Sequence, residues 1–181
     1  MDVGKPESRK WRGNMRAKDT GRILLLFVLG ILILCGFAVA EGTNVVSSGE
    51  CGTNLFYTLN DAGVLNISGT GDMRTSESEV PWETHRDSIK SVVIESGVTS
   101  IGDYAFSSCA ALADINMPDS VDSIGKYAFA GCESLTGIQL PEVRSIGAGA
   151  FSGCVGLQSI TIPGSVANLA EDAFEGCIAL T

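Results

Sequence analysis

The sequence of 181 residues predicts a repeat solenoid, built mostly of short β-strands with single helical turns and preceded by a β-hairpin segment. A nine-residue word recurs four times in the second half, and its copies begin at Ile101, Ile124, Ile146 and Leu169. The cysteines that end these copies are spaced by 23, 22 and 23 residues. Apolar and polar residues also alternate in the stretch before each copy. A fixed period of this length is typical of a solenoid, in which each coil buries its apolar face against its neighbours.

The chain begins with a basic segment that is followed by an apolar one. Residues 1–22 hold seven Lys or Arg and three Asp or Glu, whereas residues 23–40 hold no charged residue and end in Ala-Val-Ala. This order is typical of an export signal cleaved after Ala40. An uncleaved signal-anchor helix is the alternative, because the eighteen residues nearly reach the ~20 that span a bilayer. In both cases residues 1–22 stay in the cytoplasm, and residues 41–181 are expected to be secreted or at the cell surface.

The exported part of the chain is strongly acidic. Residues 41–181 hold five Lys or Arg and eighteen Asp or Glu. So few cations cannot neutralise a phosphate backbone, which excludes a nucleic acid as the partner. An anionic surface keeps a protein soluble or meets basic patches on a partner.

Three segments are expected between the export signal and the repeats. Residues 41–50 are interpreted as a flexible spacer, because they are mostly polar and include two glycines. Residues 51–73 are predicted to form the β-hairpin, since alternating apolar residues flank the turn residues 60–63. Residues 74–88 are predicted to be a polar linker that packs Trp82 onto the start of the stack.

Residues 89–181 are predicted to form the stacked coils. In each coil two apolar residues at alternate positions, such as Ile115 and Met117, predict a short strand with its apolar face inward. A proline such as Pro118 ends the strand, because proline cannot donate a hydrogen bond to the ladder. A second extended stretch is expected on another side of the coil, and the Tyr-Ala-Phe-x-x-Cys piece is predicted to be one helical turn.

The repeat unit resembles a known family. Its pattern is Leu-x-x-Ile-x-Ile-Pro, then Val-x-x-Ile-Gly, then Ala-Phe-x-Gly-Cys-x-x-Leu, which is similar to the BspA-like leucine-rich repeat of bacterial and protozoan surface proteins. The resemblance covers roughly residues 86–181, and residues 51–71 with Pro81-Trp82 are similar to the segment often found before such repeats. The resemblance implies a leucine-rich-repeat solenoid in a surface-exposed or secreted protein, with adhesion or host-matrix binding in some members. It implies no catalytic residues.

The end of the sequence departs from a complete array. The last copy has Leu169-Ala170 where Ile-Gly is usual, and the chain stops at Thr181 just as a new coil would begin. A solenoid needs a terminal cap over its last apolar face, and none is recognisable in the sequence. We therefore expect a truncated array, with room for an anchor or a further domain beyond Thr181.

The cysteine column is interpreted as part of the core. The position that recurs once per coil faces the apolar interior, so a small buried apolar side chain is the favoured interpretation. The members of this column are Cys109, Cys132, Cys154 and Cys177. Disulfides are permitted in an exported protein and stay an alternative, which leaves the redox state open. Cys51 is the unmatched thiol of the mature chain and is available to pair with another chain or with a segment beyond Thr181.

Nothing in the sequence favours catalysis. The one histidine, His85, lies in the polar linker, and the acidic residues are scattered singly. No Gly-x-Ser-x-Gly motif and no closely spaced cysteine pair of a zinc site occurs. We expect a protein that is not an enzyme, with no metal and no cofactor.

The outward column of the strand ladder is the candidate binding surface. It consists of Val93, Asn116, Gln139 and Thr161, with Asp114 and Ser159 beside it. In solenoids such columns form an extended binding face. Polar residues are also what any solvated strand face carries, so a plain soluble surface is the alternative interpretation.

Three functions are compatible with this sequence. The first is an exported surface protein that binds an extracellular protein or glycan through the strand face. The second is a structural spacer or accessory repeat module of a larger protein, and the third is an enzyme whose active site lies beyond Thr181. Contact with a membrane is expected only through residues 23–40, if they are not cleaved.

Overall fold

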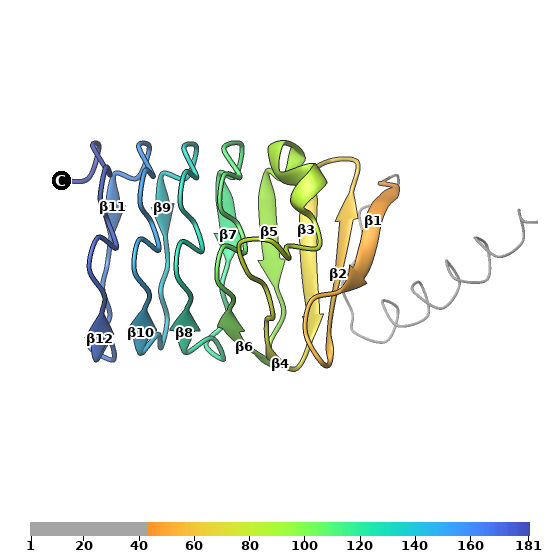
Figure 1. Cartoon of the computed structure of the whole chain (residues 1–181), viewed down its shortest axis with the longest axis horizontal. Helices are drawn as coiled ribbons and strands as arrows, with labels where there is room; N and C mark the ends of the chain where they lie inside the picture. The colour runs from red at the N-terminus through yellow and green to blue at the C-terminus, as the bar shows by residue number, and fades with distance from the viewer. Residues whose placement is uncertain (1–42) are drawn as a thin grey trace, which may run out of the picture. The chain divides into compact units, whose positions relative to one another are not determined.

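Each coil of the solenoid carries two short strands on two different sides, so two ladders run along the stack. The computed structural model describes residues 43–181, which form one unit, and residues 1–22 and the predicted export segment 23–40 lie outside the described residues. Figure 1 shows the coils stacked in sequence order, from the orange strand β1 to the blue strand β12. The predicted repeat solenoid is therefore confirmed.

The first ladder contains the longer strands. They are β1 (Val45–Glu50), β2 (Leu55–Asn60), β3 (Val64–Gly69), β5 (Ser91–Ile94) and β7 (Asp114–Asn116), hydrogen-bonded in that order. β1, β2 and β3 pair antiparallel, whereas β3, β5 and β7 pair in parallel. A further parallel pair, β9 (Gly137–Ile138) and β11 (Ser159–Ile160), continues the row in Figure 1. Val92, Ile94 and Ile115 are buried and alternate with outward residues, as the sequence predicted.

The second ladder is parallel throughout and has very short strands. They are β4 (Gly71–Asp72), β6 (Val98–Ile101), β8 (Ser123–Ile124), β10 (Ser145–Ile146) and β12 (Asn168–Leu169). Ile101, Ile124 and Ile146 point inward and are buried. These strands are the second extended stretch expected from the sequence.

The hairpin and the segment before it form one antiparallel sheet. β2 and β3 form the predicted hairpin, and the side-chain oxygen of Asn60 accepts a hydrogen bond from the Val64 N–H at 2.9 Å across the turn. The flexible spacer expected over residues 41–50 is wrong for residues 45–50, which form β1 and pair with β2. β1 is an edge strand with almost no buried side chain, so it lacks the apolar alternation by which strands are predicted.

Columns of like residues fill the interior. The buried rings of Phe106, Phe129 and Phe151 stack with centroids 5.3 and 5.2 Å apart. Trp82 is fully buried and extends this column at 5.8 Å from Phe106, so it packs on the start of the stack as predicted. Because each ring contacts rings of the coils on either side, the core is made between coils.

The corner that carries this aromatic column differs from the expected helical turn. The N–H groups of Ala105, Ser107 and Cys109 each donate to the carbonyl three residues earlier, which makes a chain of separate turns. Tyr104 and Ser108 adopt left-handed backbone, with φ of 58° and 60°. A continuous helical turn cannot pass through such residues, so none forms here.

Backbone hydrogen bonds join each corner to the next one along the stack. The N–H of Phe106 donates to the Ala128 carbonyl at 2.7 Å, and the N–H of Phe129 donates to the Ala150 carbonyl at 2.8 Å. Each coil thus offers carbonyl oxygens to the coil before it. The first coil has no repeat before it, so its carbonyls need other donors.

Side chains of residues 74–88 supply those donors. This segment ends in a 3₁₀ helix, η1 (Glu83–Ser88). The carbonyls of Asp103, Ala105 and Ser107 accept from Thr75 Oγ1, Trp82 Nε1 and Arg86 Nη1 at 2.8, 2.8 and 2.7 Å respectively. The segment predicted as a linker is therefore an amino-terminal cap, in which side chains replace the N–H groups of a missing coil.

Candidate binding surfaces

The structure brings the predicted binding residues onto the outer face of the first ladder. Val93 and Asn116 are paired in register on β5 and β7, and Gln139 and Thr161 directly follow β9 and β11. Asp114 and Ser159 lie in the adjacent row, with Gly137 between them. Val93 is half-buried and the other five predicted residues are exposed. We call this surface the outer strand face.

The outer strand face is notched at Gly137. A cavity of about 170 Å³ lies there, and Asp114, Gln139, Ser159 and Thr161 are among the residues that line it. The row that contains Val93 and Asn116 also extends to the strand before the repeats, because Asn66 on β3 pairs in register with Val93. The outer strand face is thus a row of mainly amide and hydroxyl groups with a shallow recess.

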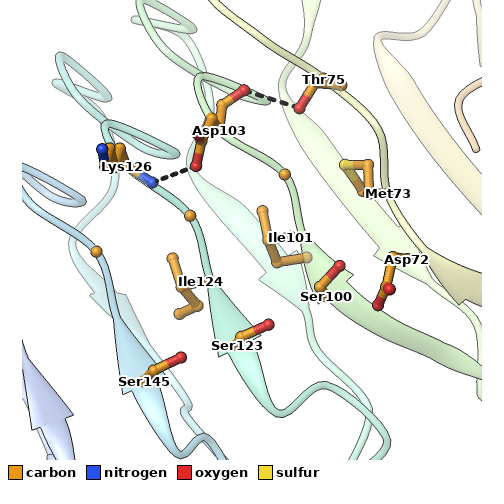
Figure 2. Close-up of a pocket in the computed structure, with 13 residues that line it drawn as sticks. Asp72, Met73, Thr75, Ser100, Ile101, Asp103, Ser123, Ile124, Lys126 and Ser145 are labelled. Carbon is orange, nitrogen blue, oxygen red and sulfur yellow. Dashed lines mark hydrogen bonds between the residues drawn. The ribbon is translucent and has the colours of Figure 1, made fainter.

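A larger hollow lies on the outer face of the second ladder. It measures about 540 Å³, and Figure 2 shows Ser100, Ser123 and Ser145 pointing the same way from successive coils. These serines pair in register on β6, β8 and β10. These serines were not among the predicted binding residues, although the recurring Ser-Ile-Gly triplet was a signal that could have found them. We call this hollow the serine groove.

Glycine creates the hollow beside the serines. A Cβ atom on Gly125 would lie 2.5 Å from the Asp103 Oδ1 and 2.7 Å from the Asp103 nitrogen, and one on Gly147 would lie 2.7 Å from the Lys126 nitrogen. No side chain can be added there without separating the coils. Close stacking of the coils therefore requires glycine at these positions. The absence of side chains there also leaves the serine groove open.

Charged groups line the rim of the serine groove. The Asp103 carboxylate accepts a hydrogen bond from the Lys126 backbone N–H at 2.8 Å (Figure 2). The exposed Asp72 carboxylate accepts one from the Thr99 hydroxyl at 2.6 Å. Hydrogen bonds from Thr99 and Ser100 hold the pKa of Asp72 below its usual value, so this carboxylate is ionised at neutral pH.

The repeated cysteines belong to the core. The thiols of Cys132 and Cys154 lie 3.2 and 3.1 Å from the carbonyl oxygens of Phe106 and Phe129 and donate to them. Burial raises the pKa of the Cys154 thiol to about 12, which keeps it protonated and able to donate.

The five cysteines among residues 43–181 are free thiols. Cys51 is only 2% exposed, so it presents little surface for the pairing with another chain that the sequence allowed. Burial raises the pKa of the Cys51 thiol to about 12, which disfavours the reactive thiolate.

The described residues contain no assembled catalytic or metal site. His85 is half-buried within η1. Among residues 43–181, no group of three His, Cys, Asp or Glu side chains is placed to hold a metal ion. No helix in that part of the chain has the length and apolar character to cross a membrane, and the apolar segment 23–40 is not included in it.

The repeats match a known family model. The model for the BspA type leucine rich repeat region matches residues 84–181 in six copies. No curated protein matches the chain.

Several solved structures resemble the chain. A leucine-rich repeat protein from Bacteroides ovatus is 37% identical over 52% of this chain and 24% of its own, with a TM-score of 0.50. One from Eubacterium ventriosum is 30% identical over 68% of this chain and 40% of its own, with a TM-score of 0.55. The T. pallidum leucine-rich repeat protein is 29% identical over 73% of this chain and 69% of its own, with a TM-score of 0.54. The chain thus spans less than half the length of the first two, and none of the three is described as an enzyme.

Proposed function

Because this chain belongs to the BspA-type leucine-rich-repeat family, we propose that it is an exported, surface-associated protein that binds an extracellular protein or glycan through its outer strand face. The basic segment 1–22 and the apolar segment 23–40 supply the export signal in this proposal. The observation that carries it is the exposed row of Asn116 on β7 with Gln139 and Thr161, which directly follow β9 and β11.

Such a row suits recognition for a physical reason. Amide and hydroxyl groups both donate and accept hydrogen bonds, so they fit the polar groups of proteins and sugars alike. Asn116 is held in register on β7, and Gln139 and Thr161 directly follow the paired strands β9 and β11. Their backbone is therefore ordered before a partner arrives, which lowers the entropy lost on binding. The recess at Gly137 adds a concave point on an otherwise flat face.

A paired substitution tests the proposed face. We expect the full chain with Asn116→Ala and Gln139→Ala to lose about tenfold or more in affinity for its partner in a panel of extracellular proteins and glycans, because two hydrogen-bonding groups are removed. Gln158→Ala is the matched control, since Gln158 is an exposed glutamine outside the row. Equal binding by the paired variant and the parent would place the partner elsewhere.

One observation favours a second candidate. Because the chain spans only 24% and 40% of the length of two solved relatives, it is also suited to act as a spacer or accessory module of a larger protein. That role predicts no saturable binding of any panel member by the parent chain. The same panel therefore separates the two candidates.

A further inference from the structure

We infer that the serine groove is a second binding site, and that its ligand is a neutral, hydroxyl-rich linear glycan lying along the stack. The groove lies on the second ladder and uses none of the residues of the outer strand face, so this inference does not rest on the proposed function. Its volume of about 540 Å³ falls within the ~300–1,000 Å³ of small-molecule sites.

Two hydroxyl groups in the serine groove lack protein partners among the described residues. Ser123 and Ser145 are half-buried, and their hydroxyls form no hydrogen bond with residues 43–181, whereas other serines such as Ser120 and Ser165 bond to backbone carbonyls. Ser100 lies close enough to Asp72 to lower its pKa and so forms the end of the row. A hydroxyl both donates and accepts, so this row offers unused hydrogen-bonding capacity to a ligand.

The side chains of the serine groove form a row that is regularly spaced along the stack. Directly paired residues on parallel strands repeat every ~4.8 Å, which is close to the length of one sugar unit in an extended chain. The in-register row has five members, one from each strand of the second ladder: Asp72, Ser100, Ser123, Ser145 and Asn168. A linear polymer with hydroxyls on each unit can therefore meet one side chain per unit.

The floor of the serine groove does not suit a peptide strand as the ligand. The backbone in the floor of the groove is already paired between coils, since Gly125 N–H donates to Ile101 O and Gly147 N–H donates to Ile124 O, both at 2.9 Å. An added peptide strand needs free backbone groups at a sheet edge. The floor offers side-chain hydroxyls instead, and these favour a ligand that carries hydroxyls.

The charge and polarity of the serine groove disfavour both a polyanion and an apolar ligand. Asp72 and Asp103 outnumber Lys126 at the groove, and the exported part of the chain is acidic, so a polyanion is repelled. The apolar residues that border the groove, Ile101 and Ile124, are buried and give an apolar ligand no surface to contact. The class of ligand that remains is a neutral polar polymer.

The test uses soluble linear β-1,4-linked glucose oligosaccharides of increasing length as probes of the full chain, with affinity measured by calorimetry. We expect affinity to rise with length until the oligosaccharide covers the five-member row, and then to level off. Ser123→Ala combined with Ser145→Ala is expected to lower affinity about tenfold, because each lost hydrogen bond weakens binding several-fold. Both serines are half-buried and their hydroxyls have no partner among residues 43–181, so an unchanged unfolding temperature checks that the fold is retained.

Gln158→Ala is the control, because Gln158 is exposed and lines neither surface, and it should bind the oligosaccharides as the parent does. Loss of oligosaccharide binding in the paired variant Asn116→Ala and Gln139→Ala, with the serine variant unaffected, would overturn the inference and move the glycan to the outer strand face. Absence of saturable binding at every length, or tighter binding of a polyanion such as polyglutamate in the groove, would also overturn it. The proposed function is tested by its own panel and survives any of these outcomes.

Discussion

Left-handed backbone at the coil corners explains why glycine recurs in one column of the stack. One column contains Ser108, Gly131, Gly153 and Gly176, whose φ values are 60°, 71°, 70° and 73°. Glycine adopts this conformation without steric cost, whereas left-handed backbone destabilises a residue with a Cβ atom by roughly 1–2 kcal/mol. The first coil is therefore the one that carries strain in this column.

This difference predicts that Ser108→Gly stabilises the protein. Relief of the left-handed strain is partly offset by the greater freedom of glycine in the unfolded chain, so we expect a gain of about 0.5–1 kcal/mol in the free energy of unfolding, measured with urea. The neighbouring Ser107, which does not have positive φ, is the control. Ser107→Gly should lower the free energy of unfolding by a similar amount, and equal losses in both variants would refute the strain argument.

Among the elements, the amino-terminal cap shows how a ladder is closed by side chains. Trp82 fills the aromatic column with its ring and satisfies the Ala105 carbonyl with its N–H, 2.8 Å away. Thr75 and Arg86 donate hydrogen bonds to the carbonyls on either side, those of Asp103 and Ser107. Two structural tasks are thus combined in one short segment.

The cap leads us to expect a specific loss from Trp82→Phe. The ring is largely retained while the buried Ala105 carbonyl loses its donor, so the free energy of unfolding should fall by about 1–3 kcal/mol. Amide hydrogen exchange should also become faster at Phe106, which links the first coil to the second. Ser88→Ala removes an exposed side-chain hydrogen bond to the His85 carbonyl and should change stability by less than about 0.5 kcal/mol. Comparable losses in both variants would mean that the cap bond is unimportant.

The elements also mark the limit of prediction from this sequence. The strands with inward Ile and Val residues were predictable because alternation and period appear directly in the sequence. β1 was missed because its side chains are almost all exposed, and the capping role of Thr75 and Arg86 depends on contacts between segments far apart in the chain. The outer strand face was predicted from the strand alternation. The Ser-Ile-Gly triplet recurs in the sequence, but the serine groove was missed because the alignment of its serines depends on the register of strands as short as two residues.

For the whole molecule, the interfaces between coils determine stability. A solenoid is stabilised by contacts between adjacent repeats, so a change at one interface acts there first. The coils approach closely at the glycine column of the second ladder, where Gly125 faces the backbone of Gly102 and Asp103. This column therefore provides a direct test of how cooperative the stack is.

We expect Gly125→Ala to open the stack between its first and second coils. The added Cβ atom would lie 2.7 Å from the Asp103 nitrogen and 2.8 Å from the Gly102 carbonyl carbon, and these backbone atoms cannot move without breaking the ladder. The expected cost is at least the ~1–3 kcal/mol of an overpacked core. Hydrogen exchange should accelerate first at the bonds that join these two coils, including Gly125 N–H to Ile101 O, while β1, β2 and β3 stay protected.

Gly164→Ala is the matched control, because nothing lies within 4 Å of its added Cβ, and it should leave stability within about 0.5 kcal/mol of the parent. Uniform acceleration along the whole stack would show that the solenoid unfolds as one cooperative unit, contrary to this expectation.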